Sequence, residues 1–430
     1  MSIEELYKLF EINPFASTDT RDIKEGCLFF ALKGDNFNGN KFAVQALDQG
    51  ASYAIIDEAA YQINDRCILV RDVLETLQKL ASFHRQQLGI PIVAITGTNG
   101  KTTTKELLTA VLSKKFTVVA TKGNLNNHIG VPLTLLSMNK STQLGIVEMG
   151  ANHLGEIADL CEIAKPNFGI ITNVGKAHLE GFGSFEGVKK TKAELYRYID
   201  KHGGSIFLNT TNTHLIEMAH GSNTIGYRTN KEGSGIEAEE ISCSPLLIFK
   251  AKFPKGWLYI KTNLVGSYNL ENALAAVCIG QHFDVDPQDI CSALEAYTPA
   301  NNRSQYSKTS SNEILMDAYN ANPTSMNAAL ESFESNESPL KAVILGDMFE
   351  LGDVAHEEHQ KIADKLSSMK LSLILLAGKE FSKCQLGHNI QVFEDGSALK
   401  TYLENLNPKG YLILIKGSRG MKLEQVIDAL

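Results

Sequence analysis

The sequence lacks a basic excess, a metal-binding cysteine motif and any long apolar run. Its 41 Lys and Arg are outnumbered by 49 Asp and Glu, which argues against a generally basic surface for nucleic acid or membranes. The seven cysteines are scattered without a C-x-x-C spacing, as expected for reduced cytosolic thiols. No apolar run approaches ~18 residues, the length of a membrane helix, and the N-terminus does not resemble a signal peptide. We therefore predict a soluble cytoplasmic protein that binds no nucleic acid and inserts into no membrane.

The length of the chain predicts about three domains, each large enough for its own core. Apolar segments alternate with polar turns and helical patterns up to Leu88, where Gly89 ends the pattern, so the first domain is expected over residues 1–87. Residues 88–300 alternate strand-like runs with helical patterns, which favours a mostly parallel sheet covered on both faces. A third α/β unit is expected over residues 301–430.

Residues 97–104 read Gly-Thr-Asn-Gly-Lys-Thr-Thr-Thr and follow an apolar run that ends at Ile95. A buried strand that leads into a glycine-rich turn, a lysine, hydroxyl residues and a helix is a phosphate-binding pattern. We expect Lys101 at the terminal phosphates and the Thr102 hydroxyl at Mg²⁺. The full Walker pattern has glycine where Ile95 stands, so a plain strand-turn-helix junction with a solvated lysine stays open as an alternative.

Polar side chains follow two later strand-like runs. Glu148 ends an apolar run, and ligands in open α/β sheets bind at the carboxyl ends of strands, so Glu148 is a candidate Mg²⁺ ligand. A solvated strand-end glutamate is the alternative. His178 is a candidate for a second metal ion, although a lone histidine is as often structural. Lys192 lies in a charged helical run, for which a solvated face is the ordinary interpretation.

The last third contains three more polar strand ends, at residues 317–323, 346–352 and 416–420. They carry Asp317, Asn320 and Asn322 in the first, and Lys416, Ser418 and Arg419 in the last. Strand ends of this kind are placed to line a substrate crevice. A capped turn is the alternative for residues 317–323, because Asn and Pro are ordinary turn residues.

Taken together, these strings resemble the Mur ligase family of peptidoglycan synthesis, over nearly the whole chain. The phosphate loop alone would also fit other ATP-dependent amide ligases, such as folylpolyglutamate synthase. The resemblance is carried by four further strings in the family's order, at residues 122–127, 148–153, 319–323 and 346–352. They are most similar to the branch that joins D-alanyl-D-alanine to UDP-N-acetylmuramoyl-tripeptide. The Asp-Asn-Pro-Arg type of motif usual in the branch that adds the third amino acid is not found.

The resemblance implies a three-domain α/β fold. Residues 1–87 would bind the UDP substrate, residues 88–300 would form a P-loop ATPase-like domain for ATP, and residues 301–430 would form a Rossmann-like ligase domain. The implied reaction passes through an acyl phosphate and uses ATP and Mg²⁺, and a monomer is expected. A catalytically silent nucleotide-binding module, or a transport or regulatory ATPase, remains the alternative from another class.

The resemblance also implies roles for individual residues. The catalytic set is Lys101, Glu148, His178 and Lys192. The metal ligands are Thr102, Glu148, His178 and Lys192, the last as a carbamate, because added CO₂ supplies the oxygen that Mg²⁺ prefers. ATP contacts are expected from Gly97, Thr98, Asn99, Gly100, Lys101, Thr102, Thr103, Asn269, Asn272, Arg303 and Asp317. Substrate contacts are expected from Thr20, Arg21, Lys33, Gly34, Asn126, Asn127, Asn320, Asn322, Lys416, Ser418 and Arg419.

Two positions depart from the family's pattern. Tyr268 stands where histidine is more usual, and residues 38–42 read Asn-Gly-Asn-Lys-Phe where Asp-Gly-His-Asp-Phe is more frequent. The sequence does not distinguish diaminopimelate from lysine as the third residue of the peptide substrate.

Overall fold

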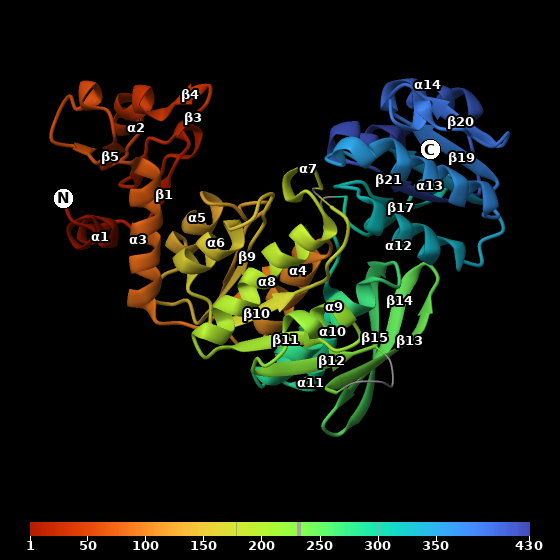
Figure 1. Ribbon diagram of the computed structural model, residues 1–430, viewed down its shortest axis with the longest axis horizontal. Helices are drawn as coiled ribbons and strands as arrows, with labels where there is room; N and C mark the ends of the chain where they lie inside the picture. Colours follow the sequence, from red (N-terminus) through yellow and green to blue (C-terminus); the bar gives the residue numbers. More distant parts are fainter. Residues whose placement is uncertain (178, 230–233, 301) are drawn as a thin grey trace.

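The computed structural model describes residues 1–177, 179–229, 234–300 and 302–430 (Figure 1). Over these residues the chain forms three α/β units, built on sheets of four, nine and six strands. The N-terminal and C-terminal units stand on opposite sides of the central one, as the red and blue ends of Figure 1 show. The predicted three-unit α/β fold is confirmed, whereas the boundaries at residues 87 and 300 stay predictions. Within the described parts of the chain, no helix combines the length and apolar character that crossing a membrane requires.

The N-terminal unit is a small parallel sheet with helices on both faces. Its strand order is β1-β2-β5-β6. Helices α1 and α3 cover one face through Leu6, Phe10 and Leu77, and α2 covers the other. Helix α3 begins after its N-cap Asp72 and ends before Gly89, whose φ of +61° closes it where the sequence predicted. The elements are α1 (Ile3–Ile12), β1 (Ala16–Ser17), β2 (Leu28–Phe30), β3 (Lys33–Gly34), β4 (Phe37–Asn38), α2 (Ala43–Asp48), β5 (Tyr53–Ile56), β6 (Cys67–Leu69) and α3 (Val73–Leu88), with 3-10 helices η1 (Thr20–Asp22), η2 (Gly39–Phe42) and η3 (Ala59–Tyr61).

The central unit is an open sheet with a helical layer on each face. The strand order is β15-β14-β13-β12-β11-β10-β7-β9-β8, parallel from β8 to β13 and antiparallel from β13 to β15. Successive side chains of β7 enter different layers: Ala94 packs on the side of α3, α5, α6 and α8, and Val93 and Ile95 on that of α4, α10 and α11. The predicted, mostly parallel sheet is confirmed. The strands are β7 (Ile92–Thr96), β8 (Val118–Ala120), β9 (Leu144–Glu148), β10 (Phe168–Ile171), β11 (Ser205–Asn209), β12 (Thr224–Arg228), β13 (Ile236–Cys243), β14 (Leu246–Phe253) and β15 (Gly256–Val265). The helices are α4 (Lys101–Leu112), α5 (Gly130–Leu136), α6 (Glu156–Ala164), α7 (Leu179–Phe182), α8 (Phe185–Lys201), α9 (Thr213–Met218), α10 (Asn269–His282) and α11 (Pro287–Ala296).

The C-terminal unit is a doubly wound sheet of the predicted Rossmann-like kind. Its order is β16-β17-β21-β18-β19-β20, and only the edge pair β16–β17 is antiparallel among the described strands. Helices α12 and α13 cover one face, and α14 with η7 covers the other. The strands are β16 (Gln305–Lys308), β17 (Glu313–Asp317), β18 (Lys341–Gly346), β19 (Leu373–Ala377), β20 (Ile390–Phe393) and β21 (Leu412–Lys416). The helices are α12 (Pro323–Glu334), α13 (Ala355–Ser368) and α14 (Gly396–Leu406), with η4 (Gly352–Val354), η5 (Phe381–Lys383), η6 (Arg419–Met421) and η7 (Leu423–Ala429).

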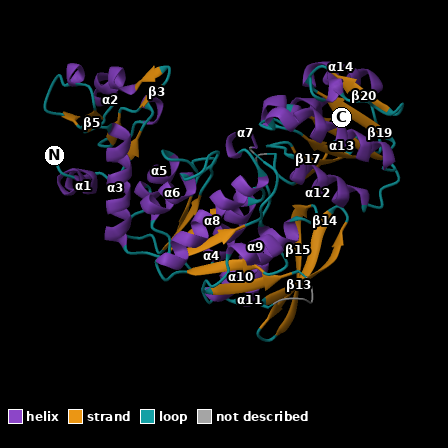
Figure 2. Cartoon of the chain, viewed as in Figure 1, coloured by secondary structure: helices purple, strands orange, loops and turns teal. Residues whose placement is uncertain are grey.

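The carboxyl ends of strands from two units meet at one place. In the central unit these are the ends of β7 and β9, and in the C-terminal unit those of β17 and β21; residues at or just after each end line a shared cavity. Figure 2 shows loops, in teal, between the central and C-terminal units near α7 and α12. This is the edge at which open α/β sheets bind ligands.

Candidate active site

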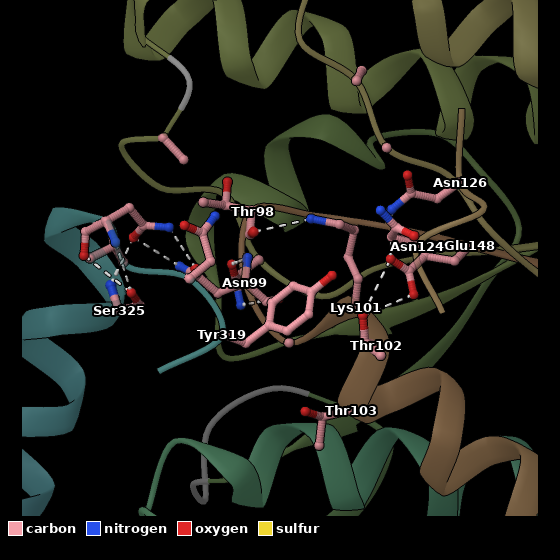
Figure 3. Close-up of a pocket in the computed structure, with 18 of the residues that line it drawn as sticks. Thr98, Asn99, Lys101, Thr102, Thr103, Asn124, Asn126, Glu148, Tyr319 and Ser325 are labelled. Carbon is pink, nitrogen blue, oxygen red and sulfur yellow. Dashed lines mark hydrogen bonds between the residues drawn. The ribbon is translucent and has the colours of Figure 1, made fainter. Parts of the chain in front are cut away.

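A cavity of about 1100 Å³ lies between the central and C-terminal units. Figure 3 shows Thr102 beside Glu148 on one side of it and Ser325, from the C-terminal unit, on the other. Cavities of this size with convergent polar groups are the usual form of a small-molecule site. The predicted site residues that line it are Thr98, Asn99, Gly100, Lys101, Thr102, Thr103, Asn126, Asn127, Glu148, Asn269, Asn272, Arg303, Asp317, Asn320, Asn322 and Lys416.

The phosphate loop has a backbone that only glycine adopts without strain. Gly97 has a φ of +144°, and a Cβ there would lie 2.0 Å from Oγ1 of Thr172. Gly100 has a φ of +78° and is the N-cap of α4; a Cβ there would lie 2.5 Å from Oδ1 of Asn272. The two glycines therefore let the loop approach its neighbours closely and start α4 at the cavity wall.

Lys101 is the first residue of α4, at the positive end of the helix. Its Nζ donates hydrogen bonds to the backbone carbonyls of Gly97 (2.7 Å) and Thr98 (3.1 Å), so the ammonium is folded back over the loop. Burial lowers the pKa of Lys101, while Glu148 opposes that shift and Arg303 adds to it. A cation and a helix N-terminus at one wall of the cavity form the arrangement that anion binding needs, which disfavours the alternative of a plain junction with a solvated lysine.

Glu148 presents a carboxylate beside the hydroxyl of Thr102. The side chain is 2% exposed, Oε2 accepts a hydrogen bond of 3.1 Å from Thr102 Oγ1, and Oε1 accepts one of 2.9 Å from Asn126 Nδ2. This burial is contrary to the alternative of a solvated strand-end glutamate. The described residues contain no group of three or more His, Cys, Asp or Glu side chains able to hold a metal. Two neighbouring oxygen donors fit a magnesium ion that takes its other ligands from phosphate and water. His178 lies outside the described residues.

Lys192 is buried within α8 rather than solvated. It is 3% exposed, and its Nζ lies 5.6 Å from the centre of the Phe182 ring. Burial lowers the pKa of Lys192 to about 7, and repulsion from Lys101 contributes to the decrease. The interpretation as a solvated charged face is therefore wrong for this residue. The cavity lining described above does not include Lys192.

The first turn of α10 is joined to α4 by a chain of hydrogen bonds. Thr104 Oγ1 donates to Asn272 Oδ1 (3.1 Å), Asn272 Nδ2 donates to Asn269 Oδ1 (2.8 Å), and Asn269 Nδ2 donates to Ser304 Oγ (3.0 Å). Ser304 N in turn donates to Asp317 Oδ1 at 3.3 Å. Three of the residues predicted to contact ATP, Asn272, Asn269 and Asp317, are thus joined through Thr104 and Ser304 into one polar chain from α4 to the C-terminal unit.

Two cations and an aromatic ring surround the end of β17. The guanidinium carbon of Arg303 lies 3.4 Å from the ring centre of Tyr319, and that of Arg419 lies 5.0 Å from it. Lys416 is 2% exposed, and its Nζ lies 2.5 Å from Asp317 Oδ2. Lys416 is thus paired with Asp317, and Arg303 and Arg419 are the two cations that bring positive charge to this side of the cavity, where an anionic ligand requires it.

Ser418 and Asn322 use their side chains within the protein. Ser418 Oγ accepts a hydrogen bond of 2.9 Å from Phe349 N, which ties the loop after β21 to that after β18. Asn322 caps α12, since its Oδ1 accepts from Ser325 N at 2.9 Å, and its Nδ2 donates to Asn99. Their predicted contacts with substrate stay predictions.

The candidate residues of the N-terminal unit lie outside this cavity. Arg21, in η1, has a side chain that is 89% exposed and pairs with Asp19. Lys33, in β3, has its Nζ 3.1 Å from Asp57 Oδ1. Thr20, Arg21, Lys33 and Gly34 are not part of the described cavity lining. The N-terminal unit is well separated from the C-terminal unit in Figure 1.

Sequence reasoning did not single out Lys105, whereas Phe349 and Glu350 belong to the strand end at residues 346–352 that was predicted to line a crevice. Lys105 is 3% exposed, with its Nζ 3.7 Å from Glu148 Oε2, and the other two residues line the cavity. The spacing of Lys105, four residues after Lys101, was the available signal, because it puts both lysines on one side of a helix. Glu350 has a φ of +64°, which only the folded backbone reveals.

Three family models match successive parts of the chain. Residues 14–85 match "Mur ligase family, catalytic domain", residues 95–280 match "Mur ligase middle domain", and residues 302–419 match "Mur ligase, glutamate ligase domain". The chain belongs to the Mur ligase family. The predicted family and enzyme class, a ligase, are thereby confirmed.

This Mur ligase is similar to named relatives over nearly its full length. It is 36% identical to the UDP-N-acetylmuramoyl-tripeptide–D-alanyl-D-alanine ligase of Bacillus subtilis (strain 168), over 96% of this chain and 92% of the relative. A crystal structure of MurF from Acinetobacter baumannii matches with a TM-score of 0.86 and 31% identity, over 96% of this chain and 92% of that one. The MurF ligase from Thermotoga maritima in complex with ADP matches with a TM-score of 0.86 and 27% identity, over 96% of each chain.

Proposed function

We propose that this Mur ligase uses ATP to join D-alanyl-D-alanine to UDP-N-acetylmuramoyl-tripeptide, giving the UDP-N-acetylmuramoyl-pentapeptide of peptidoglycan synthesis. The observation that carries the proposal is the cavity in which Lys101, Thr102 and Glu148 face the strand ends of the C-terminal unit. The proposal is also supported by the near full-length similarity of the chain to a Bacillus subtilis ligase whose name contains these substrates.

The phosphates of ATP would bind at the start of α4. Backbone N–H groups of the loop and the ammonium of Lys101, released from the Gly97 and Thr98 carbonyls, are placed to bind the terminal phosphates. Thr102 and Glu148 would hold Mg²⁺, and Glu148, His178 and carbamylated Lys192 would hold a second ion. The metal supplies positive charge that offsets the repulsion between phosphate and an incoming carboxylate. Asn269, Asn272, Arg303 and Asp317 would bind the nucleoside side.

Carbamylation of Lys192 has a physical basis in its burial. With a pKa of about 7, much of its amine is neutral near neutral pH and able to attack CO₂. The nitrogen of the neutral amine forms a bond to the carbon of CO₂, one proton leaves that nitrogen, and the product is an N-carboxylate with one negative charge. Such a group is an oxygen ligand suited to Mg²⁺.

The reaction would proceed in two transfers. A carboxylate oxygen at the end of the tripeptide attacks the γ-phosphorus, the bond to the β,γ-bridging oxygen breaks, and ADP leaves. The amine of D-alanyl-D-alanine then attacks the acyl carbon, the C–O bond to phosphate breaks, and a proton is lost as the amide forms. Arg303 and Lys416, on the C-terminal side of the cavity, are placed to offset negative charge in both steps. Exclusion of water by the C-terminal unit would protect the acyl phosphate.

The three units would divide the substrates. The N-terminal unit, proposed as residues 1–87, would hold the UDP portion through Thr20, Arg21, Lys33 and Gly34. The central unit, residues 88–300, would hold ATP and contact the peptide through Asn126 and Asn127. The C-terminal unit, residues 301–430, would bind the dipeptide side through Asn320, Asn322, Lys416, Ser418 and Arg419. We also propose that the enzyme is a cytoplasmic monomer.

Phosphate release tests this function. ATP and Mg²⁺ are supplied with UDP-N-acetylmuramoyl-tripeptide and D-alanyl-D-alanine, separately and then together. We expect rapid release only when both substrates are present. Release that ignores both would contradict the ligase proposal and favour an ATPase of another kind. Comparing diaminopimelate-containing and lysine-containing tripeptides identifies the preferred third residue.

A further inference from the structure

Lys105 is a buried cation behind the proposed magnesium ligand. Its side chain is 4% exposed, that of Glu148 is 2% exposed, and the Lys105 Nζ lies 3.7 Å from Glu148 Oε2. Glu148 belongs to the described cavity lining and Lys105 does not. The ammonium therefore lies on the protein side of the carboxylate, while the other side of the carboxylate is open to the cavity.

Lys105 acts on Glu148 through its charge and does not fix the position of the carboxylate. The distance of 3.7 Å is longer than a hydrogen bond, whereas Thr102 and Asn126 donate to the carboxylate at 3.1 and 2.9 Å. These two neutral donors hold the carboxylate in place. Because both donors are neutral, they do not supply the positive charge that Lys105 places beside the carboxylate.

The two lysines of α4 make different contacts, although Lys101 also interacts with Glu148 through its charge. Lys101 donates to carbonyl groups of the phosphate loop, and Lys105, one turn later, faces the end of β9. A buried carboxylate beside a buried ammonium forms a pair with no net charge, and attraction at such short range is strong where water is excluded. The pair by itself attracts a further cation far less than an unpaired carboxylate would.

We propose that Lys105 makes metal binding at Glu148 depend on the nucleotide. The Glu148–Lys105 pair has no net negative charge, and the nucleotide phosphates at the start of α4 supply it. The metal ion therefore binds together with the nucleotide and not before it. This order prevents a bare divalent cation from occupying the phosphate site. The inference rests on the proposed role of Glu148 as a magnesium ligand.

Titration with Mn²⁺, followed by the electron paramagnetic resonance of free Mn²⁺, tests the inference on the full chain without peptide substrates. The wild-type protein is expected to bind Mn²⁺ weakly alone and well with ADP. Lys105→Met is expected to bind Mn²⁺ alone at least tenfold more tightly, because the carboxylate loses its buried ion-pair partner. With ADP present, the two proteins should differ much less. If Lys105 served only for packing, its replacement would not make metal binding tighter.

Matched variants separate the contributions. Lys105→Arg keeps the charge and should behave as wild type, and Lys114→Met removes an exposed lysine just beyond α4 and should also change nothing. Lys105→Met/Glu148→Gln should return Mn²⁺ binding to the weak level. Lys105→Gln gives a second neutral variant if Lys105→Met does not fold.

Two results would overturn the inference in distinguishable ways. If neutral variants at Lys105 bind Mn²⁺ alone no better than wild type while Glu148→Gln weakens binding with ADP, Lys105 does not control the metal. If Glu148→Gln leaves Mn²⁺ binding with ADP unchanged, the assignment of Glu148 as a ligand fails, and the inference fails with it.

Discussion

Asn322 donates a hydrogen bond of 2.7 Å from its Nδ2 to Oδ1 of Asn99 in the phosphate loop. The residues are 223 positions apart and belong to different units. A second contact joins the same units, because Lys176 Nζ donates to Glu358 Oε1 at 2.9 Å. The position of the C-terminal unit is therefore tied to the loop expected to hold the phosphates of ATP.

Asn322→Ser should lower kcat/KM for ATP with little effect on stability. Serine retains the cap of α12 but lacks the amide that donates to Asn99. Loss of one neutral hydrogen bond costs about 0.5–1.5 kcal/mol, which corresponds to a decrease of roughly 2- to 10-fold. Steady-state kinetics and thermal unfolding measure the two quantities. In a double-mutant cycle, Asn99→Ala should add little further loss; fully additive losses would show that the two side chains act independently.

Gly97→Ala should weaken ADP binding and lower the free energy of unfolding. The new Cβ would meet Thr172 Oγ1 at 2.0 Å in a backbone region unfavourable for alanine, and strain of this kind costs roughly 1–3 kcal/mol. Gly221→Ala is the matched control, since Gly221 has a φ of +85° and nothing within 4 Å of an added Cβ. Calorimetric ADP titration and chemical denaturation are the measurements. Equal effects of both variants would rule out the steric argument.

Lys192→Ala should be nearly inactive, with a loss on the order of 10²-fold or more, as for other groups that stabilise charge at the reacting centre. A short carboxylic acid such as formate should restore part of the activity by occupying the place of the carbamate. The exposed Lys190, on the same helix, gives the control variant Lys190→Ala, which should keep normal activity. Full activity of Lys192→Ala would contradict the proposed carbamate at this residue.

The carbamate itself should depend on pH. Burial lowers the pKa of Lys192 to about 7, so the reactive neutral amine predominates above that value and the ammonium below it. At constant dissolved ¹³CO₂, the ¹³C NMR signal of the carbamate should rise from about pH 6 to about pH 8. The signal should be absent from Lys192→Ala. A wild-type spectrum without it across this range would refute carbamylation under these conditions.

Local sequence patterns predicted those parts of the site that are formed by a single strand and the loop after it. The phosphate loop and Glu148 could be placed because each follows an apolar strand, and parallel strands bring their carboxyl ends to one edge. Asp317 and Lys416 follow the same rule in the C-terminal unit, where they form an ion pair.

Pairings between distant residues could not be predicted in the same way. The burial of Lys192 depends on helices packed around α8, whereas its own sequence reads as a charged face. Asn322 was expected to contact substrate, and nothing near it in sequence indicates that its amide donates to Asn99. Lys105 was passed over because it lies on α4, whereas its neighbour Glu148 lies at the end of β9, 43 positions later in the chain.

Transfer of oxygen from the tripeptide to phosphate tests the central claim most directly. The enzyme is incubated with ATP, Mg²⁺, D-alanyl-D-alanine and UDP-N-acetylmuramoyl-tripeptide that carries ¹⁸O in its terminal carboxylate. Mass spectrometry then measures the ¹⁸O content of the released phosphate and the amount of pentapeptide formed. An acyl phosphate requires that each phosphate released with a new pentapeptide carries one ¹⁸O from the carboxylate. Pentapeptide formed with unlabelled phosphate, or phosphate released without pentapeptide, would contradict the account.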